Sequence, residues 1–142
     1  MDASPLRPRC ATGILRRVER PALRLSATVL DAPDPRALAA FYRQLFGWPI
    51  VDDHPAWVTL RPPGGGPGFS FQLEERYERP VWPAERTRQQ MQLHMDIEVE
   101  DLDGAVAYAL EAGATLADFQ PQENVRVLLD PAGHPFCFFV NA

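Results

Sequence analysis

Two spacings of apolar residues alternate along the chain. Over residues 35–46 the apolar positions fall three or four apart, the spacing of a helix that lies on a sheet. Asp34 suits the N-cap, proline follows at the first helical position, and Gly47 suits the C-terminal stop. The pattern predicts a helix whose buried face is formed by Leu38, Phe41, Tyr42 and Leu45.

The same arrangement recurs in the second half of the chain. Asp101 is a second candidate N-cap, residues 102–112 have helical periodicity, and Gly113 follows them. The expected inner face consists of Leu102, Ala105, Val106, Ala109 and Leu110.

Segments with strand-like composition surround both helices. One precedes each helix, at residues 23–32 and 93–100. Three follow each helix: residues 48–53, 56–62 and 69–74 in the first half, and residues 115–121, 125–130 and 136–140 in the second. Asp34 and Asp101 are 67 positions apart, and Phe71 matches Phe136 at an offset of 65. This repeat predicts an α+β fold of two βαβββ modules, residues 23–74 and 92–141, joined by a linker over residues 75–91.

The charge is distributed unevenly. All 14 basic residues are arginines, and residues 1–24 hold six of them against Asp2 and Glu19, a net charge of +4. The total of −5 therefore leaves −9 on residues 25–142, and this acidic body argues against a nucleic-acid partner. We interpret residues 1–22 as a flexible arginine-rich tail; an organelle-targeting segment is the alternative.

The two cysteines and the short apolar runs indicate where the protein works. Cys10 and Cys137 form neither a disulfide framework nor a zinc-site spacing, which favours a reducing cytoplasm. The longest strong apolar run is about five residues, against the roughly 20 that span a bilayer. The start "MDASPLRPRC" lacks the apolar region of a signal peptide. We expect a cytoplasmic protein without a membrane partner.

The stretch "LHMDIEVEDLD" holds the most reactive combination of side chains. In a strand, His94, Asp96 and Glu98 point to one side. His94 is thus a metal ligand, a substrate-orienting or proton-moving group, or a plain cavity-wall residue. Trp82, within the linker, can cap a pocket or simply belong to a connection. His134, in "DPAGHPF", is interpreted as a surface-turn residue.

These segments resemble the vicinal oxygen chelate superfamily, and within it the glyoxalase-like and bleomycin-resistance-like domains. The resemblance rests on "VLDAPDPRALAAFYRQLFGW", "LHMDIEVEDLDGAVAYALEAGA" and "VRVLLDPAGHPFCFFV", and covers residues 23–141. It implies mixed sheets curled into an open cup around a small-molecule site. It also implies a homodimer, because cup-forming modules often pair across chains.

Metal-dependent members of that superfamily place two ligands in each module, a histidine seven residues before the capping aspartate and an oxygen donor in the last strand. The first position is Ala27 in module one and His94 in module two. The last strands offer Gln72, a weak neutral ligand, and Cys137. Only His94 matches clearly, so the resemblance implies an incomplete site for a divalent metal.

Two main functions follow from this reading. The first is binding or sequestration of a small, aromatic or drug-like molecule without a resident cofactor, with His94 as the polar or catalytic centre. The ligand-contacting residues expected for it are Gln72, Asp96, Trp57, Trp82 and Cys137. The alternative is a metal-dependent lyase, isomerase or dioxygenase with a rearranged site around His94. A partner-binding domain with a vestigial cup is a third hypothesis.

Overall fold

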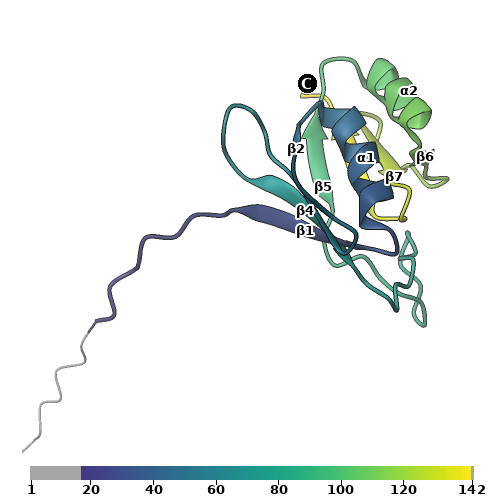
Figure 1. Cartoon of the computed structure of the whole chain (residues 1–142). Coiled ribbons are helices and arrows are strands. Elements are labelled where there is room, and N and C mark those ends of the chain that lie inside the picture. The colour runs from purple at the N-terminus through teal and green to yellow at the C-terminus, as the bar shows by residue number, and fades with distance from the viewer. Residues whose placement is uncertain (1–16, 142) are drawn as a thin grey trace, which may run out of the picture.

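The computed structural model describes residues 17–141 and contains the two predicted modules (Figure 1). The elements of module one are β1 (Ala27–Ala32), α1 (Pro35–Phe46), β2 (Ile50–His54), β3 (Trp57–Leu60) and β4 (Gly68–Leu73). Those of module two are β5 (Met95–Glu98), α2 (Leu102–Ala112), β6 (Thr115–Leu116), β7 (Val125–Leu129) and β8 (Pro135–Phe139).

Both helices begin and end at the predicted residues. The Asp34 carboxylate accepts a hydrogen bond from the Ala37 amide at 3.1 Å, and Asp101 caps α2 in the same way. Gly47 and Gly113 end the helices with φ of +70° and +115°, a left-handed conformation that favours glycine. Local capping chemistry therefore sets the helix limits.

Each module folds into a four-stranded mixed sheet. The orders are β1-β4-β3-β2 and β5-β8-β7-β6, with β1 parallel to β4 and β5 parallel to β8. The other neighbours are antiparallel. Neither sheet closes, so β1 and β5 are both edge strands. This arrangement confirms the α+β class and the duplicated plan.

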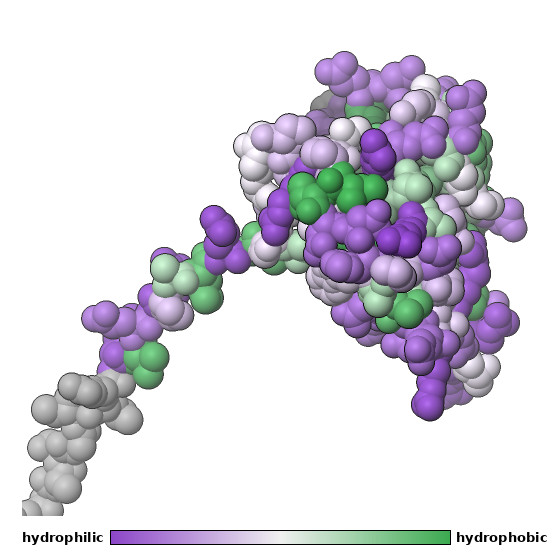
Figure 2. Space-filling view, in the orientation of Figure 1, coloured by the Kyte–Doolittle hydropathy of each residue, from purple (hydrophilic) through white to green (hydrophobic). Residues whose placement is uncertain are grey.

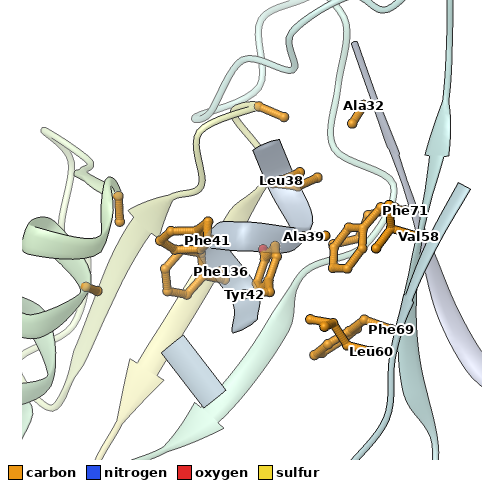
Figure 3. Packing of buried hydrophobic residues seen from close by; sticks show 14 of the residues in the cluster. Ala32, Leu38, Ala39, Phe41, Tyr42, Val58, Leu60, Phe69, Phe71 and Phe136 are labelled. Atoms are coloured by element: carbon orange, nitrogen blue, oxygen red, sulfur yellow. The ribbon is translucent and has the colours of Figure 1, made fainter. Parts of the chain in front are cut away.

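One apolar core serves both sheets. Phe41 and Tyr42 of α1 lie between the modules, with Phe41 6.1 Å from Phe136 of β8 and Tyr42 5.5 Å from Phe71 of β4, measured between ring centroids (Figure 3). Both sheets therefore turn one face toward the helices. Alternate strand residues, such as Asp96 of β5 and Cys137 of β8, face the other way.

Several expectations need correction. β1 begins at Ala27, and Leu23 and Leu25, which we expected in the strand, are 83% and 68% exposed. β6 has only two residues. Leu110 of α2, which we expected on the buried face of the helix, is 42% exposed. Residues 17–26 have neither helix nor strand and lead away from the body (Figure 2). The predicted tail lies mostly outside the described residues.

The strand register also corrects the alignment of the two modules. Val29 pairs with Ser70, and Asp96 pairs with Cys137. Positions 29 and 96, like positions 70 and 137, differ by 67, the offset of the two helix caps. The counterpart of Cys137 is therefore Ser70, and our match with Gln72, two residues further on, is wrong.

Candidate functional site

A pocket of about 200 Å³ opens between the edge strands β1 and β5. We call it the inter-module pocket. Val29 and Asp31 of β1 and His94, directly before β5, form part of its wall. The linker contributes Tyr77 and Glu78, and the turn between β7 and β8 contributes His134. The expected centre, His94, thus lies in a pocket built by both modules.

His94 also belongs to a compact group of three possible metal donors. Its Nε2 atom lies 3.2 Å from Asp96 Oδ1, and Cys137 stands beside Asp96 on the neighbouring strand. One donor atom from each of the three residues lies within 4.8 Å of the others. The structure therefore brings together three of the residues that we selected from the sequence.

The Cys137 thiol is held in its protonated form. Burial raises its pKa, and the negative charge of Asp96, together with a hydrogen bond to that carboxylate, raises the pKa further. A thiol with a raised pKa is a poor nucleophile and must lose a proton before it binds a metal. At neutral pH this side chain donates a hydrogen bond to Asp96.

The equivalent positions of module one lack such chemistry. Ala27 has no donor atom, and Ser70 is buried at 3% exposure, with its Oγ 3.1 Å from Thr59 Oγ1. Trp57 Nε1 donates to the same Thr59 oxygen at 2.9 Å. These side chains are hydrogen-bonded to one another, so they do not form a metal-ligand set like that of module two.

Among the described residues, none of the five predicted contact residues lines the inter-module pocket, Asp96 and Cys137 included. Gln72 is exposed on β4, opposite Trp57 in the strand register. Trp82 packs its ring 5.8 Å from that of Phe119, an exposed residue of the β6–β7 loop. Among the described residues, neither tryptophan nor Gln72 lines this pocket. Their role in ligand binding stays a prediction.

Sequence reasoning missed a buried polar network next to this pocket. Asp130 is 1% exposed; it accepts a hydrogen bond from the Tyr42 hydroxyl at 2.7 Å and lies 2.8 Å from His134 Nδ1. Tyr77 lies 3.3 Å from the other ring nitrogen of His134. We call these four residues the Asp130 network. The spacing of aspartate and histidine in "DPAGH" was its only local signal.

The network also keeps its two phenols protonated. Burial, followed by the charge of Asp130 and a hydrogen bond to it, holds the pKa of Tyr42 well above its usual value. Burial, with a smaller effect from Asp130, raises the pKa of Tyr77 to about 12. Our interpretation of His134 as a surface-turn residue is wrong, because its side chain is only 18% exposed and is bonded to this network.

Comparisons with known proteins agree with the fold described above. A family model described as "Glyoxalase-like domain" matches residues 27–139. A glyoxalase/bleomycin resistance protein/dioxygenase family enzyme from Burkholderia phytofirmans PsJN has 23% identity and a TM-score of 0.63, over 83% of this chain and 98% of that chain. A search of curated proteins found no match.

A second solved structure, a glyoxalase-related enzyme from Fulvimarina pelagi, has 19% identity and a TM-score of 0.61, over 84% of this chain and 89% of that chain. These similarities support the fold. In the part of the chain that the structure describes, no helix is long and apolar enough to cross a membrane. Because the family model spans most of the sequence, the chain belongs to the glyoxalase-like domain family of the vicinal oxygen chelate superfamily.

Proposed function

We propose that this protein binds a small organic molecule in the inter-module pocket, with His94 as one of its polar contacts. The observation that carries the proposal is the position of this pocket between the first strands of the two modules, where His94 and the apolar Val29 both line it. Its volume of about 200 Å³ is below the roughly 300–1,000 Å³ typical of sites for drug-sized ligands. The occupant is a small compound, or one part of a larger compound.

A blocking substitution tests this proposal. Val29→Trp places a large ring in the wall of the pocket, and Val51→Trp adds the same ring at an exposed position of β2 outside it. Amide NMR spectra of the wild type with a library of small aromatic and aliphatic compounds are expected to show shifts at Val29, Leu93 and His94. Val29→Trp is expected to abolish these shifts and Val51→Trp to keep them. Equal responses in both variants would contradict the proposal.

A metal-dependent reaction is the second candidate, and the convergence of His94, Asp96 and Cys137 favours it. The three side chains fit a zinc-like ion as a nitrogen, an oxygen and a sulfur donor, which leaves one tetrahedral position open. A bound divalent metal would supply Lewis-acid chemistry at that position. They do not reproduce the four-ligand plan, because Ala27 and Ser70 offer no matching pair.

The protein's own groups determine when such a site can fill. The Cys137 proton, now donated to Asp96, must leave before sulfur binds a cation. Metal affinity is therefore expected to rise with pH. Titration with Co²⁺ is the direct test, because a thiolate ligand produces a charge-transfer band. Cys137→Ser is expected to remove the band and Cys10→Ser to keep it, whereas a band that survives in Cys137→Ser would place the metal elsewhere.

A further inference from the structure

Asp130 fixes the orientation of His134. Its Oδ2 atom accepts from the Tyr42 hydroxyl and faces His134 Nδ1, and its Oδ1 atom accepts from the backbone amides of Ala132 and His134, each at 2.9 Å. A carboxylate surrounded by donors is an acceptor only, so His134 Nδ1 carries the hydrogen of their bond. In the neutral imidazole, Nε2 is then the acceptor atom.

This acceptor has no donor committed to it among residues 17–141. The Tyr77 hydroxyl lies 3.3 Å from His134 Nε2, but its single hydrogen is donated to the Ala132 carbonyl at the shorter distance of 2.8 Å. Tyr77 remains a phenol because burial raises its pKa. His134 lines the inter-module pocket, so its Nε2 lone pair is available to a molecule bound there.

The charge of the pocket wall indicates which donor would arrive. Asp31 and Glu78 both line the pocket, and no arginine does; the chain has no lysine. Within the described part of the chain, neither carboxylate has a salt-bridge partner. Carboxylates and an imidazole acceptor together favour a group with several N–H donors and a positive charge.

We propose that His134 receives, through Nε2, an N–H donor from a small protonated amine, with Asp130 as the positioning residue and with Asp31 and Glu78 balancing the charge. This inference rests on the proposed small-molecule function and names the ligand class of that pocket. It makes His134 a second polar contact beside His94.

Histidine NMR with three matched probes tests the inference. Long-range proton–nitrogen spectra are expected to show hydrogen on Nδ1 of His134 at neutral pH. Benzylamine is expected to shift the His134 Nε2 signal, with a smaller shift from uncharged benzyl alcohol and none from benzoate. His54, which is exposed on β2 outside the pocket, is the internal control and is expected not to respond.

Substitutions test the contribution of each group. Glu78→Gln is expected to weaken benzylamine binding about two- to fivefold, the effect of one exposed ion pair. Glu75→Gln, which removes a nearby exposed carboxylate outside the pocket, is the matched control. His134→Phe is expected to weaken binding by about tenfold or more, as the loss of one charge-assisted hydrogen bond. The wild-type spectra still decide the question if this variant does not fold.

The failure of this inference differs from the failure of the proposed function. Probes that shift Val29 and His94 but leave His134 unchanged, or equal binding of benzylamine and benzoate, would overturn the inference and leave the pocket as a ligand site. Compounds that bind Val29→Trp as well as the wild type would overturn both.

Discussion

Replacement of Asp130 by alanine is expected to be the most destabilising single change in the polar interior. The carboxylate is 1% exposed and faces donors from Tyr42, from His134 and from two backbone amides. Each buried donor that loses its acceptor without reaching water costs about 1–3 kcal/mol. Because several donors lose the same acceptor, we expect Asp130→Ala to lower the free energy of unfolding by about 3–5 kcal/mol, near the upper end for a single substitution.

Two further substitutions are compared with Asp130→Ala, one with a smaller expected effect and one as a control. Tyr42→Phe removes one donor and leaves the other three, so a loss of about 1.5–3 kcal/mol is expected, the range for a hydrogen bond to a charged group. Asp118 is an exposed aspartate of the β6–β7 loop, and Asp118→Ala is expected to change stability by less than about 0.5 kcal/mol. The expected order is therefore Asp130→Ala, then Tyr42→Phe, then the control.

Urea unfolding followed by tryptophan fluorescence measures these differences. Trp48 is a suitable reporter because its ring stacks 4.7 Å from Phe46 and 5.4 Å from Phe69. The midpoint should fall while the slope with urea stays constant, which indicates a change in stability and not in the denatured state. A loss below about 1 kcal/mol for Asp130→Ala would refute the reasoning, because a network of this burial would then contribute less than one ordinary hydrogen bond.

Three other outcomes are expected. The pKa of Tyr77 in the folded protein is about 12, against an ordinary value of 10.0, so its contribution to stability is complete below pH 10 and is lost as the pH rises toward 12. The free energy of unfolding of Tyr77→Phe, measured over the same alkaline range, should therefore fall less than that of the wild type. In a Cys10→Ser background, Asp96→Asn should speed alkylation of Cys137 by iodoacetamide, since Asp96 raises the thiol pKa; an unchanged rate would contradict this. A Cβ at Gly68 would lie 2.1 Å from the Leu60 carbonyl oxygen, so Gly68→Ala should lower the melting temperature and Gly64→Ala, which meets nothing within 4 Å, should not.

The helices were predictable because their determinants are local. Asp34 and Gly47 define α1 through contacts within one turn, and Asp101 with Gly113 does the same for α2. The strand register was harder, because "FSFQ" alternates in a way that fits two alignments two residues apart. Only the pairing of Val29 with Ser70 shows that the serine is the counterpart of Cys137.

The Asp130 network was not predictable because its members are distant in sequence. Tyr42 lies 88 residues from Asp130, and Tyr77 lies 57 residues from His134. A turn sequence such as "DPAGHP" is normally exposed, and nothing local shows that α1 and the linker cover it. The result is a histidine inside the pocket wall where a surface turn was expected.

The two modules share one backbone plan, but their equivalent positions carry different side-chain chemistry. In module one, Ser70 is bonded to the neighbouring Thr59, so it has little capacity left for a ligand. In module two, the equivalent Cys137 faces Asp96, whose other neighbour is His94. The inter-module pocket is lined by Val29 and Asp31 of module one and by His94 and His134 of module two. A bound molecule can therefore place its apolar part against Val29 and its polar part against ionisable groups from both modules.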